Sequence, residues 1–332
     1  MTRRALVIGI NKYQHAKHLS GCVADAQAMA ALLEQNKDKT ANFDCRSLLD
    51  RMEDGSDITR AALRKACREL LEAPKTDVLL YFSGHGALTA TGGYLCTSDA
   101  SKDDWGVPMQ EVVDLANKST ANSITIILDC CHGGDIANPS MLQGGSGQNP
   151  LAVLREDMTV IAASRDKETA IEAGGHGLFT AAVLDALEGG AADHMGWVTA
   201  PSIYAYVERR FGGWGQRPVY KSHSTNVVVI RKCEPLIDRL KLQELVALFP
   251  SASHKYHLDP EYEPEDEHGN LHQPVNEGKV RIARLLKQYR DAGLLRATDP
   301  VEQLFWTARR SHTVELTARG REYWWLVANK KI

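Results

Sequence analysis

The chain has 332 residues, of which 43% are hydrophobic and 24% charged. This composition excludes a disordered, collagen-like or coiled-coil protein, and the length indicates about two domains of roughly 150 residues each. The net charge of −3, from 39 Lys and Arg against 42 Asp and Glu, is too small for a global attraction to nucleic acid or to an acidic membrane.

The N-terminal segment holds only about six apolar residues between Arg4 and Asn11, too few for a signal peptide or a transmembrane span. We therefore expect a cytosolic protein without a membrane partner. Seven cysteines, an odd number without any CxxC pair, argue against a disulfide framework and against a zinc site. At least one thiol is then free for chemistry.

An α/β sheet domain is predicted up to residue 231, because short apolar, β-branched runs alternate with segments of helical periodicity. Several of these runs are apolar almost throughout, which is typical of strands covered on both faces. The segment 133–150, rich in Gly, Ser and Pro, is predicted to be a mobile functional loop. The expected strands are 4–10, 43–49, 77–83, 123–129, 158–164 and 226–231, and the expected helices are 22–35, 57–71, 109–118, 177–187 and 199–211.

The sequence changes character after residue 231, where a second, smaller region begins. The acidic segment 254–274 is predicted to be a solvated linker, and its four histidines are too irregularly spaced to predict a metal site. The other expected elements are an amphipathic helix at 235–249, a helix at 276–292, a β-hairpin formed by 303–308 and 313–316 with Arg309 and Arg310 at its tip, and a last helix at 317–330.

This order of a helix, a basic hairpin and a last helix resembles a winged-helix domain, a small α+β fold. From residue 276 onward the chain has 12 Lys and Arg against 6 Asp and Glu, a local charge of about +6. Such a face is compatible with binding nucleic-acid phosphates, and winged helices also serve as dimer or partner modules. We expect a domain at 1–232, a connecting helix and linker at 233–275, and the winged-helix-like domain at 276–332.

Two reactive side chains come directly after apolar strands. The segment 77–86 (DVLLYFSGHG) places His85 between two glycines, and the segment 123–134 (SITIILDCCHGG) places Cys130 and Cys131 after a strand. In open α/β sheets, sites are built at the carboxyl ends of the strands. A thiol needs a base close by to become a nucleophilic thiolate, and the 46 residues from His85 to Cys131 are close to the His-to-Cys separation of caspases.

These two blocks, with GCVADA (21–26) before them and HGLFTAAVL (176–184) after them, resemble the caspase-like cysteine peptidases, and within these the bacterial metacaspase- and orthocaspase-like members. The resemblance covers roughly residues 1–231. It implies a mostly parallel six-stranded sheet flanked by helices.

The resemblance also implies the roles of the site residues. Cys131 would be the nucleophile and His85 its general base and acid, while Cys130 is a neighbour whose side chain points the other way. An acidic pocket would select Arg or Lys before the cut, through charge-assisted hydrogen bonds. The main-chain N–H groups of Gly86 and Cys131 are expected to form the oxyanion hole, and Asp25 and Asp129, with Cys22 and Ser83 beside them, the acidic pocket.

Simpler interpretations exist for several of these residues. Asp25 is also placed to interact with a helix dipole, and Asp129 to cap a turn. His132 and His176 are expected to be structural or exposed rather than catalytic. Whether these four residues take part in the site depends on where the fold places them.

Activation and cofactors follow from the same resemblance. Caspases mature by cleavage in the loop after the Cys strand, but the first Lys or Arg after Cys131 is Arg155, which leaves either a single cut there or activity without processing. Many metacaspases need calcium bound by clustered aspartates. Only Asp99, Asp103 and Asp104 cluster here and the longer acidic pattern is missing, so we expect no cofactor and no metal, with calcium dependence as the alternative.

The sequence thus predicts a caspase-like cysteine endopeptidase that cleaves proteins after Arg or Lys, in bacterial stress, antiviral defence or cell death. Residues 235–332 would bind a regulatory protein partner or, alternatively, DNA. The rival hypothesis is a non-proteolytic adaptor or DNA-binding regulator in which the caspase-like fold is a scaffold. The paired motifs of His85 and Cys131 argue against that rival.

Overall fold

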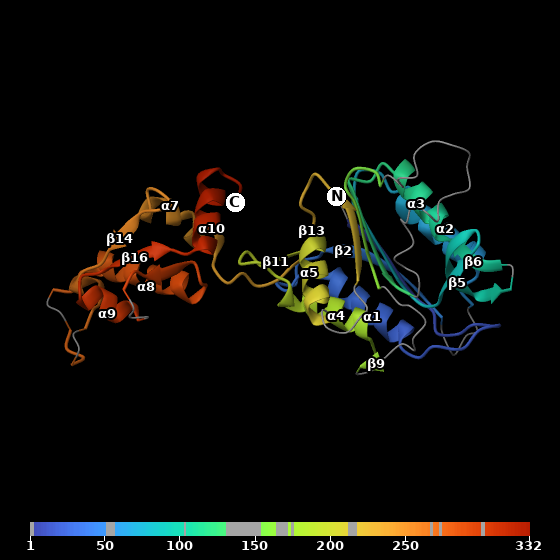
Figure 1. Cartoon of the computed structure of the whole chain (residues 1–332), viewed down its shortest axis with the longest axis horizontal. Helices are drawn as coiled ribbons and strands as arrows, with labels where there is room; N and C mark the ends of the chain where they lie inside the picture. Colours follow the sequence, from blue (N-terminus) through green and yellow to red (C-terminus); the bar gives the residue numbers. More distant parts are fainter. Residues whose placement is uncertain are drawn as a thin grey trace. The chain divides into compact units, whose positions relative to one another are not determined.

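The protein is described from a computed structural model, which divides the chain into two compact units, 1–234 and 235–332 (Figure 1). None of the helices in the described part of the chain combines the length and apolar composition that a bilayer crossing needs. The predicted loop 133–150 and Cys131 lie outside the described residues. The structure describes residues 3–50, 57–102, 104–130, 154–163, 172–173, 176–211, 218–265, 268–271, 274–299 and 303–332.

The first unit contains a six-stranded central sheet. Its strands, in the order β12-β8-β7-β3-β1-β2, are parallel except for β12, which runs antiparallel to β8 at one edge. The expected mostly parallel sheet is therefore confirmed. The strands are β1 (Arg3–Gly9), β2 (Phe43–Leu49), β3 (Asp77–Ser83), β7 (Ser123–Asp129), β8 (Met158–Ala162) and β12 (Val219–His223).

Helices cover both faces of this sheet, as Figure 1 shows. Because successive side chains of a strand point to opposite faces, Leu79 and Tyr81 join one hydrophobic core while Leu80 and Phe82 join the other. The first core lies under α1 (Cys22–Glu34), α4 (Leu178–Asp185), its continuation η3 (Ala186–Gly190) and α5 (Ala200–Phe211), and the second under α2 (Arg60–Leu71) and α3 (Met109–Lys118).

Among the described residues of the first unit, three small antiparallel sheets accompany the central one. The sixth strand of the central sheet was expected at 226–231, and this is wrong: the strand there, β13, pairs with β11, and β12 takes the sheet edge. The small sheets consist of β4 (Gly86–Thr89), β5 (Gly92–Ser101) and β6 (Asp104–Pro108); of β9 (Glu172–Ala173) and β10 (His176–Gly177); and of β11 (Trp197–Thr199) and β13 (Val229–Lys232).

The second unit is a small α+β arrangement around a three-stranded antiparallel sheet with the order β14-β16-β15. The family resemblance to winged helices stays a prediction. The elements are α6 (Arg239–Gln243), α7 (Leu245–Leu248), β14 (Lys255–His257), η4 (Pro260–Tyr262), α8 (Glu277–Asp291), β15 (Leu295–Ala297), α9 (Leu304–Arg309), β16 (Thr313–Leu316) and α10 (Ala318–Ala328).

Two expectations for this unit are wrong. In the segment 254–274, residues 255–262 are not a solvated linker, because β14 pairs with β16 and both Leu258 and Tyr262 are buried. The hairpin of 303–308 with 313–316 is replaced by helix α9, whose buried Leu304, Thr307 and Ala308 recur at helical spacing. Strand β16 pairs with β15 instead of with residues 303–308.

Candidate active site

The predicted motifs meet at the carboxyl edge of the central sheet. Strand β3 lies between β1 and β7, with Ser83 opposite Gly9 on one side and Asp129 on the other. The two blocks that are 46 residues apart in the sequence therefore end next to one another in space. This is the edge at which parallel α/β sheets carry their sites.

Strand β1 brings helix α1 to the same edge. A Cβ on Gly9 would lie 2.3 Å from the carbonyl oxygen of Cys22, so only glycine lets the start of the helix approach the strand this closely. Asn11 fixes the helix start, because its Oδ1 accepts hydrogen bonds from the N–H groups of Cys22 and Val23, at 2.9 and 3.3 Å. This places Asp25, in the first turn of α1, over the ends of β1 and β3.

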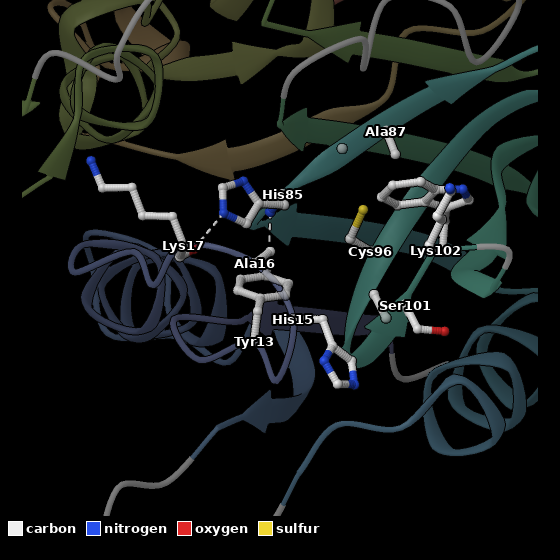
Figure 2. A pocket seen from close by; sticks show the side chains of 12 residues that line it. Tyr13, His15, Ala16, Lys17, His85, Ala87, Cys96, Ser101 and Lys102 are labelled. Atoms are coloured by element: carbon white, nitrogen blue, oxygen red, sulfur yellow. Dashed lines mark hydrogen bonds between the residues drawn. The ribbon is translucent and has the colours of Figure 1, made fainter.

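His85 is held by its backbone and by its ring (Figure 2). Its N–H donates to the hydroxyl of Tyr13 at 2.7 Å, and its carbonyl accepts from the N–H of Cys96 at 3.0 Å. The rings of His85 and Tyr13 are 4.6 Å apart. Burial raises the pKa of Tyr13 well above its ordinary value, so the phenol stays neutral beside the imidazole.

One hydrogen bond settles the tautomer of a neutral His85. Its Nε2 lies 2.7 Å from the carbonyl oxygen of Lys17. A carbonyl oxygen only accepts, so Nε2 carries the proton and Nδ1 keeps its lone pair. Nδ1 is therefore the atom able to act as a general base.

Of the two adjacent cysteines, the structure describes only Cys130. Its side chain is 1% exposed and belongs to the core under α2 and α3, which is consistent with a packing role. Cys131 is outside the described residues, so its role as nucleophile stays a prediction. Gly86, expected to contribute an oxyanion N–H, begins β4 directly after His85.

The two carboxylates that the resemblance assigns to the acidic pocket are both buried at this edge. Asp25 is 2% exposed and Asp129 3%. The hydroxyl of Ser83 donates to Oδ2 of Asp25 at 3.1 Å. Cys22, the fourth residue expected here, is buried at the first position of α1. The four residues predicted to form the acidic pocket thus lie on α1, β3 and β7 at this edge, and their role in selecting the substrate stays a prediction.

Three residues that the sequence did not single out for this site complete it. His176, at the start of β10, places its Nδ1 2.7 Å from Oδ1 of Asp25. Thr180 donates its hydroxyl to Oδ2 of Asp129 at 2.7 Å, so it accepts from the hydroxyl of Tyr81 at 2.6 Å. His176 and Thr180 stand in the block HGLFTAAVL, and its resemblance to the family was the only signal for them.

The charge of Asp25 depends on these neighbours. Burial raises the pKa of its carboxyl above the ordinary value, and the nearby Asp129 also raises it. Hydrogen bonds from His176, from Ser83 and from the N–H of Gly177 lower it, but less than burial and Asp129 together raise it. A cation close to Asp25 would stabilise the ionised form of its carboxyl.

The aspartates considered for calcium have other partners. Asp99 accepts hydrogen bonds from the N–H of Arg60 at 3.1 Å and from the hydroxyl of Thr97 at 2.6 Å, and Asp104 pairs with the guanidinium of Arg60 at 2.5 Å. Asp103 lies outside the described residues. Within the described ranges, no three His, Cys, Asp or Glu side chains gather as a metal site.

Comparisons with known proteins agree with this geometry. Residues 2–230 match the family model described as the caspase domain. The chain is 30% identical over 205 residues to metacaspase-6 of Arabidopsis thaliana, covering 57% of this chain and 53% of that protein. It is 30% identical over 160 residues to metacaspase-7 (44% and 38% covered) and 32% identical over 157 residues to metacaspase-4 (44% and 37%) of the same plant. The chain therefore spans about half or less of these relatives.

A solved structure supports the fold alone. The crystal structure of a protein from Geobacter sulfurreducens superposes with a TM-score of 0.50 at 18% identity, covering 70% of this chain and 100% of that one.

Proposed function

Because its residues 2–230 match the caspase-domain model, the chain belongs to the caspase-domain family, and we propose that it is a cysteine endopeptidase that cleaves proteins after Arg or Lys. The observation that carries this proposal is the pair of buried carboxylates, Asp25 and Asp129, at the sheet edge that presents His85. A buried acidic pair is costly without a counter-charge, and a basic side chain of the substrate supplies one.

The reaction uses the two motif residues in sequence. Nδ1 of His85 takes the proton of the Cys131 thiol, and the thiolate adds to the scissile carbonyl. The C–N bond then breaks, and His85 gives the proton to the leaving amine. Water, deprotonated by His85, hydrolyses the thioester and restores the thiol. The N–H groups of Gly86 and Cys131 would stabilise the oxyanion.

The pocket favours Arg and Lys for different reasons. The guanidinium of Arg offers a planar fork of donors, whereas the ammonium of Lys is a compact point charge. Among the described residues, three donors bond to Asp25, and a carboxylate has about four acceptor positions. A substrate cation would therefore meet one remaining position on Asp25 together with the carboxylate of Asp129.

The test is the cleavage of quenched fluorescent peptides that differ only in the residue before the cut. The proposal predicts cleavage after Arg and Lys, none after Asp, and loss of at least about a thousandfold in kcat for Cys131→Ala. Cys130→Ala is the matched control and keeps the activity. Cleavage by the Cys131→Ala variant at the wild-type rate would overturn the assignment of the nucleophile.

The role of residues 235–332 is a separate part of the proposal. We assign them to binding of a regulatory protein partner, because the acidic segment that precedes residue 276 belongs to the same folded unit. The whole unit has 15 Lys and Arg against 14 Asp and Glu, a net charge of +1. The local surplus that made DNA a candidate partner disappears at the scale of the unit.

A further inference from the structure

A cavity of about 520 Å³ lies directly beside His85 and has no part in the acidic pocket. It is bounded by the loop between β1 and α1, by the start of β4, and by β5 and β6. Figure 2 shows His85 on one side, with Cys96, Ser101 and Lys102 across from it. Its lining residues are Tyr13, His15, Ala16, Lys17, His85, Gly86, Ala87, Cys96, Ala100, Ser101, Lys102 and Trp105.

The cavity and the acidic pocket belong to opposite faces of the central sheet. Tyr13 and Cys96, which line the cavity, are part of the core under α2 and α3. Asp25 and Asp129 instead contact His176 and Thr180, on the face covered by α1 and α4. The ends of the strands, with His85, separate the two.

We propose that this cavity binds the substrate residues that follow the cut, and that it favours an acidic residue at the first or second of these positions. The inference rests on the proposed peptidase activity. The side chain before the cut enters the carboxylate pair on one face of the sheet. His85 must protonate the amine that leaves, so the chain that carries this amine extends past His85, where the cavity opens.

The chemistry of the cavity wall selects the substrate side chain. Besides His85, three lining residues are cationic or become so on protonation, namely His15, Lys17 and Lys102, and none of the described residues that line the cavity is an Asp or a Glu. The Lys17 side chain extends outward beside His85, whereas Lys102 lies on the far wall (Figure 2). A carboxylate on the departing segment would be attracted by this charge, and a basic side chain there would be repelled.

The test uses peptides with Arg before the cut and Glu, Ala or Lys after it, at the first or at the second position. For the full-length wild type, kcat/KM is expected to fall from Glu to Ala to Lys by about fivefold per step, as exposed charge pairs allow, and the differences should shrink at high salt. Lys102→Glu is expected to reverse the order. The matched control is Lys118→Glu, because Lys118 is exposed at the end of α3 and does not line this cavity. This variant is expected to keep the wild-type order of preference.

This design distinguishes a failure of the cavity assignment from a failure of the proposed peptidase activity. Equal kcat/KM for Glu, Ala and Lys at both positions, with cleavage after Arg intact, overturns the cavity assignment alone. The cavity assignment is also overturned if neither Lys102→Glu nor His15→Glu changes the order of preference. Absence of cleavage of every Arg peptide contradicts the proposed function itself.

Discussion

Asp25 shows how the surroundings of one side chain set the conditions under which the proposed pocket works. The carboxyl is almost fully buried, and burial together with Asp129 raises its pKa, against hydrogen bonds from His176, Ser83 and Gly177. An acid whose pKa is raised loses its charge at a higher pH than an ordinary aspartate. Since the charge is what attracts Arg or Lys, substrate binding should weaken as the pH falls through that raised pKa.

This gives a pH prediction with a defined sign. In His176→Ala, the carboxyl of Asp25 loses a hydrogen bond that lowers its pKa, so the rise of KM for an Arg peptide should begin at a higher pH than in the wild type. The measurement is KM as a function of pH, determined separately from kcat. The control is His223→Ala, because His223 bonds the carbonyl of Leu154 instead. Coincident KM profiles for wild type and His176→Ala would contradict this role.

At the residue scale, the sequence predicted the motif residues but not those that hold them. Asp25, Ser83, Asp129 and His85 stand in blocks that resemble the family. Their partners come from far away: His176 is 151 positions from Asp25, and Tyr13 is 72 from His85. The Lys17 contact uses a main-chain carbonyl, which any residue supplies. No local pattern marks such partners, because only the tertiary fold brings them together.

Gly9 shows how one element positions another. A Cβ at this position would lie 2.3 Å from the Cys22 oxygen and 2.8 Å from the Cβ of Ala26, both fixed parts of α1. Gly9→Ala should therefore push the helix away from β1, lower the stability by about 1–3 kcal/mol, and raise KM because Asp25 moves with the helix. Urea unfolding and KM for an Arg peptide measure the two effects.

A second glycine is the control for that experiment. A Cβ on Gly93, in β5, would meet only the Met109 side chain, at 2.9 Å from its sulfur. A methionine side chain moves easily, so Gly93→Ala should cost less than about 1 kcal/mol and leave KM unchanged. Equal losses of stability and KM for the two variants would contradict the packing role of Gly9.

At the element scale, the strands with continuous apolar runs were predicted best. The expected bounds 43–49, 77–83 and 123–129 are those of β2, β3 and β7. Edge strand β12 was missed, because its sequence VYKSH is largely polar and only its pairing with β8 makes it a strand. The run QLFWTA was taken for a strand because a short apolar run does not separate strand from helix.

At the scale of the whole molecule, charge counted over a segment differs from charge counted over a folded unit. Acidic residues of the described part of 254–274 pair with the basic helix α8: Lys279 bonds Asp259 at 2.5 Å, and Lys287 bonds Glu263 at 2.9 Å. These lysines are therefore engaged within the protein. We predict no salt-dependent binding of the full-length protein to duplex DNA at near-physiological salt, measured by fluorescence anisotropy. Micromolar binding that weakens steeply with salt would restore the DNA-binding alternative.

Activation also belongs to this scale, because it depends on where the first basic residue after Cys131 lies. Arg155 precedes β8, which begins opposite the start of β7, so it stands at the amino edge of the sheet, about 20 Å of strand length from the carboxyl edge. Its N–H donates to Asn117 at 2.9 Å and its guanidinium to the carbonyl of Ser119 at 2.8 Å. The peptide bond after Arg155 is therefore held away from the active site of its own chain. We expect the uncleaved chain to be active.

The matched experiment compares the wild type with Arg155→Gln. Both should cleave an Arg peptide with the same kcat/KM and without a lag, and intact-mass measurement should show one full-length species throughout the reaction. The glutamine keeps a donor for the Ser119 carbonyl, so folding is preserved. Two observations together would show instead that processing activates the enzyme. The wild type would show a lag that ends as the product cut after Arg155 accumulates, and the Arg155→Gln variant would be inactive. Because Arg155 stands at the edge of the sheet opposite the active site, such a cut would be made by a second molecule of the enzyme, and the rate of processing would rise with enzyme concentration.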